Sequence, residues 1–104
     1  MAKAIRMRAK LTEGDKAEVR FLVRHPMESG FRKDKAGKSI PAHFVHSLKV
    51  EHKGRVLLDS HLGTSIATNP LFHLKFKGAA VGDEVAVSWV DNKGETRSDS
   101  TTVK

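Results

Sequence analysis

The chain of 104 residues contains no cysteine, and this absence excludes several kinds of chemistry. Without a thiol there can be no disulfide, no thiolate nucleophile, no cysteine-ligated zinc site and no iron–sulfur cluster. The chain also cannot carry a substrate bound covalently to a cysteine. The absence leaves the compartment open, because cysteine-free domains occur in both oxidising and reducing surroundings.

Aromatic residues and long apolar runs are also scarce. The chain has no tyrosine and a single tryptophan. No stretch approaches the ~20 apolar residues of a membrane helix, so we expect no contact with a membrane. The basic N-terminal residues are not followed by an apolar run of signal-peptide length. We therefore expect a protein that stays in the cytoplasm or is exported together with a partner.

Positive charge, in contrast, is abundant. The 19 lysines and arginines outnumber the 12 acidic residues, and the formal net charge is +7. Such a surface attracts acidic partners of any kind, including nucleic acid, anionic lipid and acidic protein. The length suits one hydrophobic core, and we predict a single domain over residues 1–104.

Apolar and polar residues alternate along most of the chain, which is the pattern of half-buried β-strands. The predicted strands lie at residues 5–10, 17–24, 44–52, 55–58, 71–77, 84–90 and 96–103, the last a polar edge strand. Glycine-containing turns separate several of them, such as Lys53-Gly54 and the stretch from Asp91 to Gly94. Seven short strands without a helical stripe favour an all-β, immunoglobulin-like antiparallel sandwich, although the Cys–Trp–Cys pattern of antibody domains is missing.

Residues 25–42, HPMESGFRKDKAGKSIPA, break the alternation. A connection of this length in a small domain is usually functional or mobile. Two prolines fix the backbone near its ends, and we predict an ordered loop with a basic tip. Its apolar side chains Met27, Phe31 and Ile40 either form a contact surface or tuck under the sandwich.

No catalytic, cofactor or metal site can be assembled from the sequence. Serines lie in no nucleophile motif, no glycine-rich phosphate loop is present, and most acidic residues sit in predicted turns, where capping explains them. Of the six histidines, His43 and His46 are three apart, so on a strand they point to opposite faces. A zinc or copper(II) site made of histidines from several loops remains an alternative to scattered, hydrogen-bonded histidines. We predict no catalytic residue, no cofactor and no metal.

Binding of single-stranded nucleic acid is the alternative function that the charge suggests. Strands that carry Arg6, Arg8, Lys10, Arg20 and Arg24 would form a positive stripe. Base stacking needs exposed rings, however. The alternation places Phe21, Phe44, Phe72 and Phe76 on core faces, which leaves Phe31 as the one phenylalanine free to stack.

The motifs of the loop and of the segments that follow it resemble those of the SoxZ family. They are HPMESG at 25–30, RKD at 32–34, GK at 37–38, IPAHF at 40–44, NP at 69–70, FHLKF at 72–76, GD at 82–83 and WVDNKG at 89–94. The resemblance covers almost the whole chain, and the loop motif is long and unusual.

The resemblance implies a function in bacterial thiosulfate oxidation. SoxZ is the partner of SoxY in the SoxYZ heterodimer, in which SoxY carries sulfur intermediates on a cysteine near its C-terminus. Other Sox enzymes act on the carried group through transient contacts. The resemblance further implies an immunoglobulin-like fold, no cofactor, and a periplasmic location reached by export together with a leader-bearing SoxY. A chain without cysteine fits the non-catalytic, scaffolding subunit of such a carrier.

The partner-binding residues that we predict are Met27, Phe31, Arg32, Lys33 and Ile40, all in the loop. One sheet of the sandwich would pack on SoxY through an apolar patch, as stable heterodimers commonly do. Further candidates for that patch are Leu57, Leu62 and Ile66. Arg32 or Lys33 would help to hold the anionic thiosulfonate.

Overall fold

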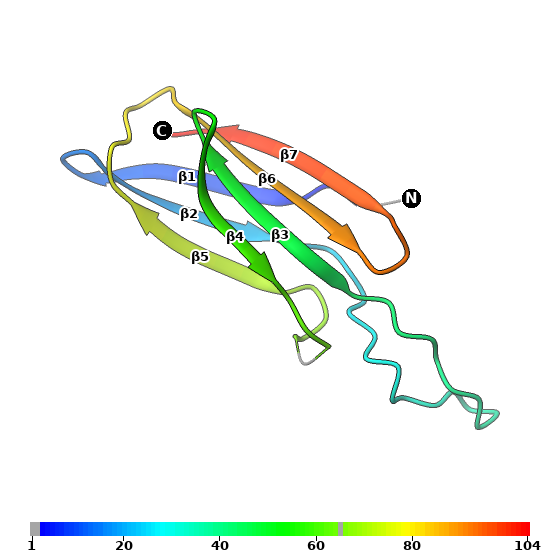
Figure 1. The fold of residues 1–104 in the computed structure, drawn as a ribbon. Coiled ribbons are helices and arrows are strands. Elements are labelled where there is room, and N and C mark those ends of the chain that lie inside the picture. Colours follow the sequence, from blue (N-terminus) through cyan, green and yellow to red (C-terminus); the bar gives the residue numbers. More distant parts are fainter. Residues whose placement is uncertain (1–2, 65) are drawn as a thin grey trace.

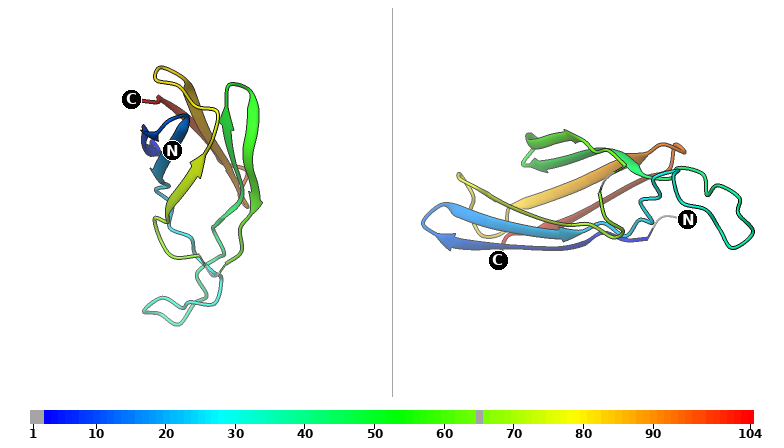
Figure 2. Two further views of the ribbon diagram at one scale, coloured as in Figure 1. Left: turned by 90° about the vertical axis from the view of Figure 1, so that its left-hand side faces the viewer. Right: turned by 90° about the horizontal axis from the view of Figure 1, so that it is seen from below.

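The computed structural model describes residues 3–64 and 66–104, which fold into two packed antiparallel sheets (Figures 1 and 2). One sheet has the strand order β1-β2-β5 and the other β4-β3-β6-β7. The strands are β1 (Arg6–Glu13), β2 (Lys16–Leu22), β3 (Val45–His52), β4 (Arg55–His61), β5 (Leu71–Phe76), β6 (Glu84–Asp91) and β7 (Thr96–Thr102). The predicted all-β sandwich of seven strands is confirmed. The described residues form no helix that could cross a membrane.

The core lies between the two sheets and follows the alternation of the sequence. Trp89, Phe21 and Leu48 are the largest side chains that are almost completely buried. Phe44 and Phe72 are among the half-buried side chains packed against this core. β7 is an edge strand, as predicted, and its end meets the other sheet through a parallel bridge between Ala9 and Val103.

The predicted inward face of β3 is wrong at the start of that strand. Strict alternation would bury His46 with Leu48, but Val45 is fully buried and His46 is exposed. The pairing of β3 with β6 shifts between Val45 and Ser47, which is the signature of a β-bulge. The extra residue reverses the facing of the strand, so that Val45 and Leu48 both point inward.

Residues 25–42 extend beyond one end of the sandwich (Figure 1), and we call this segment the arm. The turn between β6 and β7 lies at the same end, whereas the turns that join β1 to β2 and β3 to β4 lie at the opposite end. The molecule is elongated as a result, with principal extents of 55 × 21 × 20 Å.

Candidate functional site

The arm is an ordered two-stranded ribbon. Isolated antiparallel bridges join Glu28 to His43 near its base and Lys33 to Ser39 near its tip. Between them the Ile40 N–H donates to the Arg32 carbonyl oxygen over 2.9 Å. Backbone hydrogen bonds along the ribbon thus satisfy groups that an irregular loop would leave to water. The prediction of an ordered excursion is confirmed.

A side chain closes the tip of the arm. One carboxylate oxygen of Asp34 accepts the N–H groups of Ala36 and Lys38 over 2.9 and 3.0 Å, and the Gly37 N–H donates to the Asp34 carbonyl oxygen over 3.0 Å. This is the usual way in which aspartate stabilises a turn. It leaves the ammonium groups at the tip exposed; they belong to Lys33, Lys35 and Lys38.

The middle of the arm requires a glycine. Gly30 has φ of +90°, a conformation that side-chain-bearing residues rarely adopt. A Cβ at this position would also lie 3.1 Å from the Cβ of Ala42 on the returning strand. Gly30 therefore lets the two strands of the ribbon approach each other.

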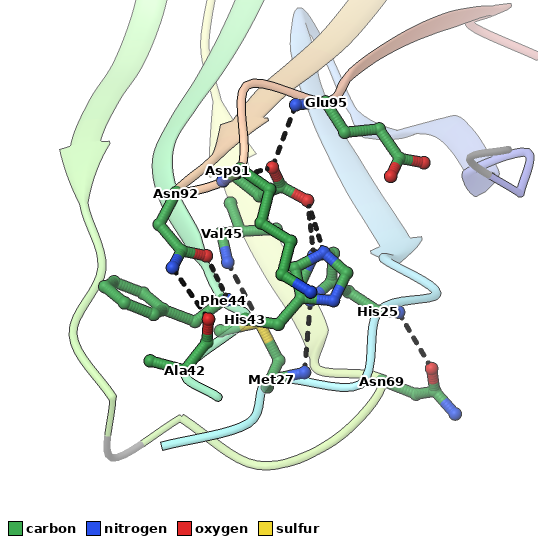
Figure 3. Close-up of polar contacts among 11 residues, drawn as sticks. His25, Met27, Ala42, His43, Phe44, Val45, Asn69, Asp91, Asn92 and Glu95 are labelled. Atoms are coloured by element: carbon green, nitrogen blue, oxygen red, sulfur yellow. Dashed lines mark hydrogen bonds and ion pairs between the residues drawn. The ribbon is translucent and has the colours of Figure 1, made fainter. Parts of the chain in front are cut away.

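The base of the arm is held by a cluster of His25, His43 and Asp91, in which His25 and Asp91 are buried and His43 is half-buried (Figure 3). The Nε2 atoms of His25 and His43 lie 3.0 and 2.8 Å from the same Asp91 oxygen, Oδ2. The two rings meet edge to face with centroids 4.4 Å apart. Both ends of the arm are thereby tied to the end of β6.

The other oxygen of Asp91 organises the turn between β6 and β7. Asp91 Oδ1 accepts the N–H groups of Lys93 and Glu95, each over 2.9 Å (Figure 3). Burial opposes ionisation of Asp91, but the hydrogen bonds from His25 and His43, together with the two backbone bonds, outweigh it and lower its pKa to about 2. Asp91 is therefore an anion that four donors stabilise.

Two asparagines reinforce this base. Asn92 accepts the Phe44 N–H with Oδ1 and donates Nδ2 to the Ala42 carbonyl oxygen, both over 2.8 Å. Asn69 accepts the His25 N–H over 2.9 Å with its side chain and donates its own N–H to the His25 carbonyl oxygen (Figure 3). The arm thus leaves the sandwich from a fixed position.

The cluster brings three possible metal ligands together, since one atom from each of His25, His43 and Asp91 lies within 4.8 Å of the others. The surroundings of His25 favour a hydrogen-bonded cluster instead. The Met27 N–H donates to His25 Nδ1 over 3.1 Å, so the ring carries its proton on Nε2 and donates it to Asp91. If a metal ion were bound to Nε2, the proton of the ring would have to be on Nδ1. There it would face the Met27 N–H, one donor against another. Metal-bound histidines normally donate that proton to an acceptor.

The five predicted contact residues differ in how far the structure exposes them. Met27 is buried in the core and its sulfur accepts the Val45 N–H over 3.3 Å, so its prediction as a surface contact is replaced by a role in the core of this chain. Phe31 is 86% exposed, and Lys33 is also exposed. Ile40 is half-buried. Arg32 is exposed, but its guanidinium makes a two-pronged ion pair with Glu28 at 2.7 and 3.1 Å.

The large apolar side chains that the described part of the chain exposes lie on four separate segments. Phe31 is on the arm, Val56 on β4, Leu71 on β5 and Val81 in the connection to β6. The further candidates for the patch are half-buried against the core; they are Leu57, Leu62 and Ile66. Phe31 is the most exposed large apolar side chain in this group.

Four histidines contact carboxylates, and His46 and His61 are exposed, which agrees with the simpler interpretation of scattered histidines that are on the surface or hydrogen-bonded. His52 Nε2 lies 2.8 Å from Asp83, and His73 Nε2 lies 2.9 Å from Glu18. The sequence interpretation missed the shared partner of His25 and His43. The signal available was Asp91, the first residue of a predicted turn, together with one histidine at each end of the loop.

Comparison with protein families gives a match over nearly the whole chain. Residues 5–102 match the family described as sulphur oxidation protein SoxZ. No match was found among curated proteins. The family match includes the arm, the cluster at its base and all seven strands. Only the two ends of the chain lie outside it. The chain therefore belongs to the SoxZ family and has a role in the Sox system of sulfur oxidation.

Proposed function

We propose that this chain is the non-catalytic subunit of a SoxYZ sulfur carrier heterodimer. In this proposal SoxY bears the sulfur intermediates on its C-terminal cysteine, and the present chain supports SoxY and helps to present it to the Sox enzymes. The lack of any cysteine supports this division of labour, because the chain has no thiol to load.

The observation that carries the proposal is the exposed tip of a firmly anchored arm. Phe31 offers an aromatic contact of the kind that dominates protein interfaces, and it is 86% exposed. Exposed lysines follow it in the sequence at the tip, and the carried thiosulfonate that they would meet is anionic. Since Glu28 already neutralises Arg32, we assign the contact with the anion to Lys33 rather than to Arg32.

A non-enzymatic role agrees with the contacts of the buried cluster. An Asp–His pair can orient a general base, but then the second ring nitrogen must reach a nucleophile. Here His25 uses Nε2 for Asp91 and Nδ1 for the Met27 N–H. His43 also directs Nε2 to Asp91, and no hydrogen bond between its Nδ1 and a hydroxyl is seen among the described residues. The hydrogen-bond donors of the cluster therefore hold the arm in place.

We further propose a periplasmic location, reached by export together with a leader-bearing SoxY. Membership of the SoxZ family supports this, if the chain works together with SoxY as proposed above. Fractionation of cells that produce the chain with and without SoxY tests it. The chain should reach the periplasm only with SoxY, and secretion of the chain alone would contradict the proposal.

The proposed function is tested by purifying the chain with the SoxY-like protein encoded beside it and measuring turnover of carrier-bound sulfur by the Sox enzymes. We expect a stable 1:1 complex and slower turnover with Phe31→Ala or Lys33→Ala. Matched controls are Val81→Ala, in the connection from β5 to β6, and Lys16→Ala, at the start of β2; both residues are exposed and outside the arm, and the variants should leave turnover unchanged. Failure of the complex to form would contradict the proposal. Equal effects of arm and control variants would remove the arm from it.

A further inference from the structure

The positive charge of the sandwich gathers on the outward side of the β1-β2-β5 sheet. The residues between the buried ones of these strands point outward, and we call their surface the basic face. Its charged side chains are Arg6, Arg8, Lys10, Arg20 and Lys75, with Glu18 as the acidic residue and His73 beside it. The positive stripe predicted from the sequence is thus present, except that Arg24 lies beyond the end of β2.

The opposite sheet shows that this charge is not spread evenly. On its outward side the register aligns Lys49 with Ser88, and Ser88 with Ser98. The neighbouring row aligns Glu51 with Ala86. With Asp59 of β4, which pairs with Lys49, these rows carry one positive and two negative charges and otherwise small side chains, so the basic character of the sandwich belongs to one of its two faces.

Strand pairing on the basic face places like charges opposite each other. Arg8 pairs directly with Arg20, whose neighbour on the other side is His73. Like charges directly opposite each other in a sheet destabilise it. The carboxylate of Glu18 accepts from the Arg20 Nε atom over 3.0 Å and contacts His73 at 2.9 Å, and no ion pair to Arg8 is seen among the described residues. Folding alone does not explain why Arg8 is an arginine.

An apolar anchor lies next to these cations. Arg6 pairs with Leu22, which pairs with Leu71 at the start of β5. Leu71 is 69% exposed. A shallow hollow is lined by Arg6, Met7, Arg8, Arg20, Phe21, Leu22 and Leu71. Its outward-facing part therefore combines arginines with exposed leucine.

We infer that the basic face is a docking surface for an acidic protein segment that carries an apolar side chain among its carboxylates. The apolar side chain would sit against Leu71, and the carboxylates would pair with Arg6 and Arg8, whose guanidinium groups suit bidentate contacts. Charge of this kind mainly raises association rates and selects partners, which suits a transient visitor to a carrier. The inference rests on the proposed function for the identity of that visitor, but the docking chemistry stands on the face itself.

Binding of a defined probe to the full chain tests the inference. The probe is a short labelled peptide in which glutamates flank a leucine, and its affinity is measured by fluorescence anisotropy at low and physiological salt. Arg6→Gln with Arg8→Gln should weaken binding about tenfold, because two solvent-exposed ion pairs, each weak by itself, are lost. Lys53→Gln with Lys93→Gln, at exposed turn residues of the other sheet, removes the same charge and should change binding by less than about twofold.

A second measurement separates docking from folding. Arg8→Gln relieves the repulsion with Arg20, so it should raise the urea midpoint of unfolding. The same variant should weaken binding of the probe. A lowered midpoint together with weaker binding would show damage to the fold and overturn the inference. Equal losses of binding in the face variant and in the turn variant would overturn it too, since net charge alone would then explain them.

Two further outcomes are decisive. Tighter binding of an oligothymidylate with the same net charge than of the peptide would assign the face to nucleic acid and overturn the inference. Loss of the complex with the SoxY-like protein in the Arg6→Gln, Arg8→Gln variant would assign the face to the stable heterodimer instead of a transient visitor, and would overturn it as well. If the wild-type chain forms no such complex, the proposed function fails, whereas the peptide result still decides the docking chemistry.

Discussion

Replacing Asp91 by asparagine removes the anion at the base of the arm while it keeps the size of the side chain. An asparagine can still accept the Lys93 and Glu95 N–H groups with its oxygen. Its amide group would then face the Nε2–H of His25, donor against donor, where the carboxylate accepted. We expect Asp91→Asn to destabilise both the fold and the attachment of the arm.

The magnitude follows from the pKa of Asp91, which the native contacts lower from 3.8 to about 2. A shift of this size corresponds to about 2 kcal/mol of stability at neutral pH. Because the native pKa is depressed, this contribution is fully present above pH ~4 and is lost as the pH falls toward ~2. The free energy of unfolding of Asp91→Asn should therefore lie about 2 kcal/mol below that of the wild type at pH 6, and the difference should shrink at pH 2.5.

Urea titrations at the two pH values measure this difference. The comparison with the variant matters because hydrogen bonds from His52 and Arg97 also lower the pKa values of Asp83 and Asp99, so the wild-type curve contains their titration too. Equal stabilities of wild type and variant at pH 6 would refute the reasoning. So would a difference that stays undiminished in acid.

Hydrogen exchange locates the effect. The Met27 N–H donates to His25, whose orientation depends on Asp91, so its exchange should accelerate in Asp91→Asn. Asp83→Asn is the matched control, because Asp83 bonds His52 in the same manner but lies near the opposite end of the sandwich. The control should lose stability without loosening Met27. Equal acceleration in both variants would show general destabilisation and contradict a local role for Asp91.

Further predictions concern single positions. Gly30→Ala should disturb the arm, because it adds a Cβ that lies 3.1 Å from Ala42 at a residue with positive φ. Hydrogen exchange of the Ile40 N–H checks this: we expect weaker protection, and unchanged protection would contradict the prediction. Met27→Ala should lower the free energy of unfolding by about 2–5 kcal/mol, while Phe31→Ala should change it by less than ~0.5 kcal/mol. Urea unfolding of both variants checks the assignment of Met27 to the core. Similar losses in the two variants would refute that assignment. Trp89→Phe should cost less than truncation of a buried aromatic usually does, because its buried Nε1 has no partner among the described residues; a loss above ~3 kcal/mol would contradict this.

Much of the fold was predictable because local sequence and tertiary burial agree in most strands. Val85, Val87 and Trp89 alternate with half-buried residues in β6 as expected. The start of β3 was not predictable, because the bulge near His46 is set by pairing with β6, and a period of two cannot reveal a shift in register.

The candidate site was predictable only in part. The length, prolines and charges of residues 25–42 indicated an ordered, exposed segment, and the structure has one. The cluster that holds it joins His25 to Asp91 over 66 positions and His43 to Asp91 over 48 positions, and only the packing of the two sheets brings these residues together. For the same reason the burial of Met27 could not be separated from the exposure of Phe31: both are apolar residues in a loop, and the hydrogen bond from Val45 to Met27 is tertiary.

The most direct test of the central claim is native mass spectrometry of this chain together with its SoxY-like partner after exposure to thiosulfate and the loading enzyme. The account predicts a 1:1 complex in which the added sulfur mass is found on the cysteine-bearing partner, while this chain keeps its unmodified mass. A covalent sulfur adduct on this chain, or two proteins that remain separate, would contradict it.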